Sequence, residues 1–363
     1  MTTRRKRALK IISLLTAMLF VYAFLSWFLV RTSTTSEMHI KEFYKEPKNS
    51  MDIAIIGASE MYADYSPPLA YKKYGFTGYN YCMEGTAGQL YVPMLETYFS
   101  RQSPQLVVIE VNGFFYSEEY CKREANSRRL FDNIPLTAGR FGLVNKYVEG
   151  DKMSYYLPLI KHHSNWHDLS YQFVRAKRLV LSDFRGVSPT KSLGTRTTTD
   201  SQIKKYAKVK NPTLGQIGKD NLRGTIDFLK DSGVKQVLFI RAPHMGRMTE
   251  DSAKELEEII TDNGYDFLDC DLIAQDVIGL DEKTDYYNCE HLNAFGCEKF
   301  TDFLGKYITE HYQLDKTHTE DVERQWQESA DFTEKVFVKL KERTLFDEDK
   351  EYYESNVYNL VDF

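Results

Sequence analysis

Three short motifs lie where strands of a parallel sheet would end, and they contain groups suited to nucleophilic catalysis. Ser59 follows the apolar run 52–56, Gly85 lies in the glycine-containing turn 84–88, and Asn112 follows the apolar run 106–111. Ligands bind beyond the carboxyl ends of such strands, so we expect these residues to share one site. There the Ser59 hydroxyl would be the nucleophile. Backbone N–H groups at Ser59 and Gly85 and the side-chain amide of Asn112 would donate to a developing oxyanion.

A base for this serine is expected close to the last predicted helix. His291 lies in the segment 285–296, and a serine, a base and an acceptor that orients the base make up an activated nucleophile. The nearby acceptors are Asn288, Asp285 and Glu290. Each motif alone has a simpler explanation, because small residues and asparagine are common in turns. Their combination favours a catalytic site.

The elements that would position these residues alternate along the chain. Strands are predicted at 52–56, 78–81, 106–111, 236–241 and 265–268, and helices at 67–74, 89–100, 217–231, 250–262 and 293–311. Such alternation predicts an α/β fold with a central parallel sheet covered on both faces, a three-layer α/β/α sandwich. The domain would span 51–312, with a mostly helical insertion at about 114–212.

The N-terminal region predicts a membrane anchor. Residues 11–30 carry no charge, and at about 1.5 Å per residue a helix of this length crosses a bilayer core of ~30 Å. Five basic side chains precede the run within residues 1–10, so the positive-inside rule predicts a cytoplasmic N-terminus and an exported remainder. A cleaved signal peptide is the alternative, although no small-residue cleavage motif follows. Residues 31–50 are polar without a clear period, which predicts a linker.

Composition narrows the functional classes. The chain has 363 residues, 42% of them hydrophobic, and a net charge of -5, so nothing indicates binding to nucleic acid. Five cysteines without C-x-x-C spacing indicate neither a disulfide framework nor a zinc site. His163 and His167 have the spacing of helical metal ligands but lack a recognisable third ligand. Neither a metal nor an organic cofactor is therefore expected.

The C-terminal tail, residues 313–363, is charged and contains scattered aromatic residues. Part of it has an apolar stripe at helical spacing, which favours a helix packed on the domain. A segment that docks a partner is the alternative.

Taken together, these motifs resemble the SGNH (GDSL-like) hydrolase superfamily, whose sheet is flavodoxin-like. The resemblance covers roughly residues 51–112 and 215–311, through Gly57-Ala-Ser59, the glycine turn, Asn112 and Glu290-His-Leu-Asn293. It implies Ser59 as nucleophile, His291 as base, and Ser59, Gly85 and Asn112 as the oxyanion hole. The position three before the histidine usually holds aspartate in that family, and here it holds Asn288.

Within the superfamily, the chain is similar to membrane-anchored members encoded with bacterial envelope-polymer systems. These include the accessory protein of lipoteichoic-acid D-alanylation and the alginate O-acetylation proteins, which share a stretch like 156–166. The similarity implies an extracytoplasmic esterase or O-acyltransferase that acts on a cell-surface polysaccharide or a teichoic-acid-type polymer. The alternative is a weakly active or inactive accessory protein docked on a multispanning membrane O-acyltransferase.

Overall fold

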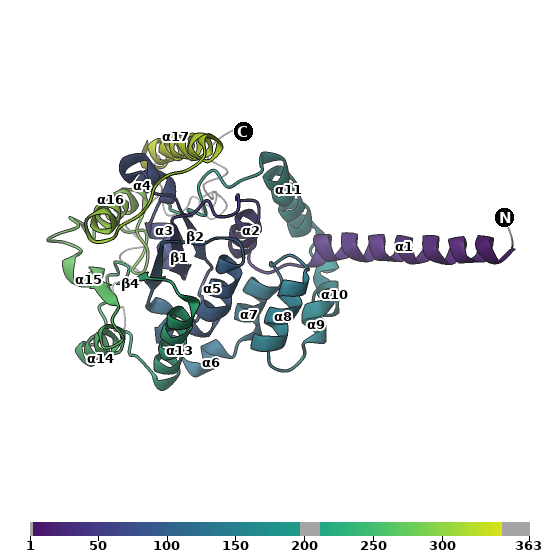
Figure 1. Ribbon diagram of the computed structural model, residues 1–363, viewed down its shortest axis with the longest axis horizontal. Coiled ribbons are helices and arrows are strands. Elements are labelled where there is room, and N and C mark those ends of the chain that lie inside the picture. Colours follow the sequence, from purple (N-terminus) through teal and green to yellow (C-terminus); the bar gives the residue numbers. More distant parts are fainter. Residues whose placement is uncertain (1–2, 197–210, 343–363) are drawn as a thin grey trace.

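The computed structural model of the protein describes residues 3–196 and 211–342. Within these residues, parallel strands form one sheet in the order β2-β1-β3-β4-β5 (Figure 1). The strands are β1 (Ile53–Gly57), β2 (Gly78–Cys82), β3 (Leu106–Glu110), β4 (Gln236–Arg241) and β5 (Asp266–Asp269). The predicted parallel α/β fold is thus confirmed, with each predicted strand within a residue or two of its position. The strand order reverses between β1 and β3, the place where open α/β sheets leave a crevice for ligands.

Both faces of the sheet are buried because its strands are apolar on both sides. Ala54 and Ile56 of β1 belong to one apolar core, and Ile53 and Ile55 belong to another. Helices that contribute to the first core are α2 (Thr34–Phe43), α5 (Tyr91–Phe99), α13 (Gln216–Ser232) and α14 (Glu250–Thr261). Helices that contribute to the second are α3 (Ser59–Asp64), α4 (Pro67–Tyr74), α15 (Cys270–Ile273) and α16 (Ala294–His311).

The segment between β3 and α13 contains several helices up to residue 196. Its α-helices are α6 (Glu118–Cys121), α7 (Glu124–Phe131), α8 (Ala138–Tyr147), α9 (Met153–Tyr156), α10 (Leu159–His162) and α11 (Leu169–Arg185). The described residues between β2 and α13 also form the 3₁₀ helices η1 (Gly88–Leu90), η2 (Asn112–Phe115) and η3 (His163–His167). Helices α9, α10 and α11 lie around the base of α1 (Thr3–Leu29), which projects away from the rest of the molecule (Figure 1). Helix α1 is long and apolar enough to cross a membrane or to act as a signal anchor.

The prediction of a linker at 31–50 is wrong. Helix α2 lies within this segment, and Ile40 and Phe43 are fully buried in the first core. Its polar side chains are buried as well, because Glu37 pairs with Arg175 and Glu42 pairs with Arg185 of α11. A helix that buries ion pairs shows no apolar stripe in the sequence, which explains the error.

The C-terminal tail contributes α17 (Glu320–Glu342), which packs against α4 and α16 (Figure 1). Its Trp326 is fully buried, with the Lys191 ammonium 4.9 Å from the ring centroid. The predicted packing of a tail helix on the domain is therefore confirmed for the described residues, whereas 343–363 lie outside them. The five cysteines are all buried and unpaired.

Candidate active site

Ser59 is delivered to the switch point of the sheet by β1. The strand ends at Gly57, and Ser59 is the first residue of α3, with Ala58 as its N-cap. A side chain at Gly57 would not fit, because its Cβ would lie 2.8 Å from the Cβ of Glu110 on the neighbouring β3. Glycine therefore allows β1 and β3 to run closely together up to the point where the chain turns into Ser59.

His291 is held near Ser59 by a tight loop that is tied to α3. Within the loop, Tyr287 N–H donates to the His291 carbonyl oxygen at 2.9 Å, and Tyr286 bridges Leu292 in antiparallel fashion. The Leu292 N–H donates to Oδ1 of Asp64 at 2.8 Å. Asp64 is the last residue of α3, the helix that begins with Ser59. The same short helix thus presents the serine and anchors the histidine loop.

Ser59 and His291 line one cavity of about 200 Å³. Its lining residues are Ser59, Tyr62, Ala63, Glu84, Gly194, Arg196, Tyr287, Asn288, His291 and Leu292. Among the described residues, the Ser59 hydroxyl forms no hydrogen bond with His291, and such contacts in enzymes often tighten only when substrate binds. The structure therefore brings the two predicted catalytic groups together from opposite ends of the chain.

Asn288 is the hydrogen-bond partner of the His291 ring. Its Oδ1 lies 3.0 Å from Nδ1 of His291, and it also accepts the backbone N–H groups of Glu290 and His291 at 2.8 and 3.0 Å. Two backbone donors require that the oxygen of the amide, rather than its nitrogen, points towards the ring. Nδ1 must then carry the proton, so the lone pair of Nε2 is available to accept one from a nucleophile.

Of the two carboxylates considered as alternatives, Asp285 has other partners and Glu290 is exposed. Asp285 is buried, and its carboxylate pairs with Lys299 at 2.6 Å and accepts the N–H of Asp281 at 2.8 Å. Glu290 is exposed overall, and burial of its carboxyl together with the charge of Glu60 raises its pKa, with His244 and Arg241 opposing the shift. Within the described chain, neither carboxylate is hydrogen-bonded to the His291 ring. Both carboxylates lie near the histidine in the sequence, but of these three side chains only that of Asn288 is hydrogen-bonded to the His291 ring.

The predicted oxyanion donors beyond Ser59 are not among the residues that line the cavity. The Nδ2 group of Asn112 donates to Glu60, while its Oδ1 accepts from Arg241 at 2.6 Å. One N–H of the Asn112 amide is thus already engaged. Gly85 has a positive φ of 56° and follows Glu84, which does line the cavity. Its role and that of Asn112 stay predictions.

A buried network of charges lies behind Ser59, and the sequence indicated little of it. Arg241 Nε contacts Asp271 at 3.1 Å, and the Nε2 atom of His244 lies 3.7 Å from the carboxylate of Glu60. Arg241 ends β4, His244 follows it closely, and Glu60 is the residue after Ser59. Two cations and two carboxylates are present, so their charges balance without solvent.

These contacts shift pKa values in opposite directions. Burial and Arg241 lower the pKa of His244, but the carboxylates of Asp271 and Glu60 outweigh them and raise it to about 10. Burial opposes ionisation of Glu60, yet His244 and His291 lower its pKa to about 2. Burial, reinforced by the charge of Glu60, raises the pKa of Glu110 to about 8. At neutral pH, His244 is therefore a cation, Glu60 an anion and Glu110 neutral.

The pKa of His291 is lowered, in contrast to that of His244. Burial lowers it to about 4, with further lowering by His244 and Arg196 and partial compensation by Glu60. Its imidazole is consequently neutral at pH 7, which is the form that accepts a proton. Burial alone would not distinguish a base from a packed side chain, but the adjoining cavity does.

Arg196 is a cavity residue that sequence reasoning missed. Its carbonyl oxygen accepts the N–H of Ala294, the first residue of α16, at 2.7 Å, which holds this segment beside the histidine loop. Its guanidinium lies 5.2 Å from the centroid of the Tyr287 ring and, among the described residues, forms no ion pair with a carboxylate. It stands in a polar tract whose composition resembles a surface loop, so no local signal marked it.

Comparison with known proteins places the chain in no family. No family model matches it, and no curated protein matches it. Among solved structures, a gut microbial diltiazem-metabolizing enzyme is similar with a TM-score of 0.26 and 12% sequence identity. The match covers 72% of this chain and 48% of that chain, so the chain spans about half the length of that structure.

Proposed function

We propose that the chain is a membrane-anchored serine esterase or O-acyltransferase of the SGNH type, built on a three-layer α/β/α sandwich. The observation that carries this proposal is the shared cavity of Ser59 and His291, with Asn288 bound to the far side of the imidazole. The position of Ser59 at the switch point of a parallel sheet supports the same proposal.

In the proposed reaction, the Ser59 hydroxyl attacks the carbonyl carbon of an ester while Nε2 of His291 takes its proton. The tetrahedral intermediate collapses, and the imidazolium returns that proton to the departing alkoxide, leaving an acyl group on Ser59. Water or a sugar hydroxyl then attacks the acyl-serine, again with His291 as base. Water gives hydrolysis, and a sugar hydroxyl gives acyl transfer.

The cavity itself indicates a substrate class. Arg196 provides a positive charge beside the catalytic groups, and a planar guanidinium can bind phosphate or carboxylate through two parallel hydrogen bonds. An acyl ester on an anionic polymer, such as a teichoic-acid-type chain or an acidic polysaccharide, fits this charge. We further propose that α1 spans the cell membrane with its N-terminus in the cytoplasm, which would place this cavity outside the cell.

The test is labelling of the full-length protein with a fluorophosphonate probe. Wild-type protein should be labelled and Ser59→Ala should not, with stability changed by only about 0.5 kcal/mol. Ser164→Ala, at an exposed serine outside the cavity, is the matched control and should be labelled like wild type. Equal labelling of the Ser59→Ala protein would place the nucleophile elsewhere.

Two observations favour a second function. The neutral Asn288 beside His291 and the engaged amide of Asn112 both weaken a catalytic site relative to one with an aspartate and a free amide. An accessory protein, docked on a multispanning membrane O-acyltransferase and positioning the polymer, fits a weak site. Folded wild-type protein that stays unlabelled by the probe would favour this function over the first.

A further inference from the structure

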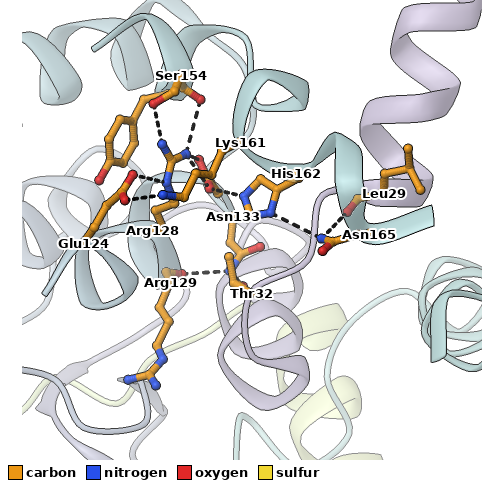
Figure 2. Close-up of polar contacts among 12 residues, drawn as sticks. Leu29, Thr32, Glu124, Arg128, Arg129, Asn133, Ser154, Lys161, His162 and Asn165 are labelled. Carbon is orange, nitrogen blue, oxygen red and sulfur yellow. Dashed lines mark hydrogen bonds and ion pairs between the residues drawn. The ribbon is translucent and has the colours of Figure 1, made fainter. Parts of the chain in front are cut away.

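The end of α1 is held by the helical insertion through its backbone. Asn165 of η3 donates to the carbonyl oxygen of Leu29 at 2.9 Å, and Figure 2 shows Asn165 lying between the His162 ring and this last turn of α1. The buried guanidinium of Arg175 donates to the carbonyl oxygens of Trp27 and Phe28 at 2.9 and 3.2 Å. These donors satisfy carbonyl groups that have no partner inside the helix.

The same ties fix the direction in which the domain faces. His162, the last residue of α10, contacts Asp132 at 2.9 Å, and Asp132 in turn contacts Arg128 of α7 at 3.1 Å, so the segment that carries Asn165 is linked to the interior of the insertion. Arg175 is also paired with Glu37 of α2, the helix that packs on the sheet. Because α1 is joined to the domain by these buried contacts, the surface around its end has a set orientation to α1.

That surface is unusually apolar. On α11, large apolar side chains are exposed at Leu169, Phe173, Val180 and Phe184, and the last of these is 87% exposed. Their spacings of four, seven and four residues put them on one side of the helix, and the side away from them is buried through Gln172, Arg175 and Ser182. The Phe173 ring packs edge-on against Phe28 of α1, with 5.4 Å between centroids. The exposed stripe is therefore continuous with the apolar surface of α1.

Short helices around the base of α1 add to this apolar surface. Met153 of α9, Ile160 of α10 and Trp166 of η3 are exposed, and α10, η3 and α11 all contact α1. An exposed lysine, Lys177, accompanies them, and the nearby Lys161 is paired with Glu124 at 2.5 Å. Apolar and tryptophan side chains mixed with lysine are typical of helices that lie in the interface of a bilayer.

We infer that this juxtamembrane face, formed by Met153, Ile160, Trp166, Phe173, Val180 and Phe184, lies in the interface of the bilayer that α1 spans. The inference rests on the proposed membrane anchorage. Continuity with α1 selects lipid as the occupant, because a bilayer crossed by α1 must surround its exit. Lys177 on this face then meets anionic head groups, an interaction that contributes about 1 kcal/mol.

This placement keeps the catalytic cavity close to the membrane. The hydroxyl of Ser33 donates to the carboxylate of Glu84, which lines the cavity. Ser33 is four residues beyond Leu29, so their Cα atoms are at most about 14 Å apart. The site thus receives an acyl donor or polymer that is itself attached to, or presented at, the membrane surface.

The test uses the full-length protein in vesicles of phosphatidylcholine and phosphatidylglycerol that contain a nitroxide-bearing lipid. Single cysteines carrying an environment-sensitive fluorophore replace Phe184 on the juxtamembrane face, Phe20 in α1 and Val338 on α17. Phe20 and Val338 are 73% and 55% exposed, and the native cysteines are buried, so labelling selects the new thiols. We expect Phe184→Cys to show at least about half of the quenching seen with Phe20→Cys, and Val338→Cys to show almost none.

Comparing the labelled positions 184, 20 and 338 distinguishes the ways in which the inference could be wrong. Strong quenching at Phe20 with none at Phe184 would overturn the juxtamembrane face while leaving α1 in the membrane. Absence of quenching at both would overturn the anchorage on which the inference rests. If the fluorophore at position 184 is not quenched in lipid vesicles but its emission shifts to the blue in native membranes, a membrane protein occupies the face and the inference is wrong.

Discussion

The side-chain oxygen of Asn288 accepts three N–H groups, and one of them belongs to the ring of His291 at 3.0 Å. The two backbone donors fix the amide, and the amide fixes the tautomer of the histidine. Asparagine therefore orients the base as an aspartate would, but it adds no negative charge to stabilise the imidazolium. This difference leads to the first two predictions.

Asn288→Asp is expected to raise esterase turnover at neutral pH by at least about tenfold, because a carboxylate stabilises the imidazolium formed during attack. The two backbone N–H groups that reach Oδ1 would also hold the new carboxylate ionised. Turnover of p-nitrophenyl acetate measures the effect. Asp285→Ala is the control, and it should alter stability more than turnover because Asp285 pairs with Lys299. A fall in rate with Asn288→Asp would show that another group assists His291.

The pH dependence of kcat/KM should reflect the lowered pKa of His291. Burial lowers this pKa to about 4, so the base stays neutral and active down to that pH and loses activity only below it. The expected acid limb therefore lies near pH 4 instead of near 6.5. In Asn288→Asp, the added charge should move the limb to higher pH. A wild-type limb between pH 6 and 7 would contradict the burial of the base.

Arg196→Ala should raise KM for esters that carry a phosphate or carboxylate, with about a tenfold effect expected for the loss of one charge-assisted contact. The KM for a neutral ester such as p-nitrophenyl acetate should change little. Arg129→Ala, which removes a guanidinium bonded to the Glu84 carbonyl and absent from the lining of the cavity, provides a comparison. Equal effects on neutral and anionic esters would show that Arg196 does not select anionic substrates.

Glu110→Gln should make the stability of the protein less dependent on pH. Burial, followed by the charge of Glu60, raises the pKa of Glu110 to about 8, well above its value of 4.5 in an unfolded chain. Between these values the native state keeps a proton that the unfolded state has lost. Stability therefore falls as pH rises through this window, by at most about 1.4 kcal/mol per pH unit. Urea unfolding at pH 5 and pH 8 should show a smaller difference in the glutamine variant.

Glu60→Gln should destabilise the fold by about 3–5 kcal/mol, because it leaves the buried cation of His244 without one of its two carboxylates. The exposed pair of Glu118 and Lys122 offers a matched comparison, since Glu118→Gln should change stability by less than about 1 kcal/mol. Chemical unfolding of both variants at pH 7 measures the contrast. Similar values for the two would mean that the network behind Ser59 is solvated.

Local sequence patterns were sufficient to predict the sheet and the two residues of the catalytic pair, Ser59 and His291. Each strand is a short apolar run, and the helices between them have apolar stripes, so their alternation was sufficient to predict a parallel α/β fold. Ser59 and His291 were recognisable because each follows or precedes such an element. Asn288 was recognisable by its spacing from His291, and its hydrogen bond depends only on the geometry of one short loop.

Tertiary structure alone decided which other groups surround these residues. Helix α2 looked like a polar linker because its glutamates are neutralised by arginines of α11, more than a hundred residues away. Arg196 is held beside the cavity by a backbone hydrogen bond to the start of α16. Glu60, which follows β1, lies next to His244, which follows β4. Burial of charge depends on partners that are distant in sequence, and no local pattern records which partner each charge will find.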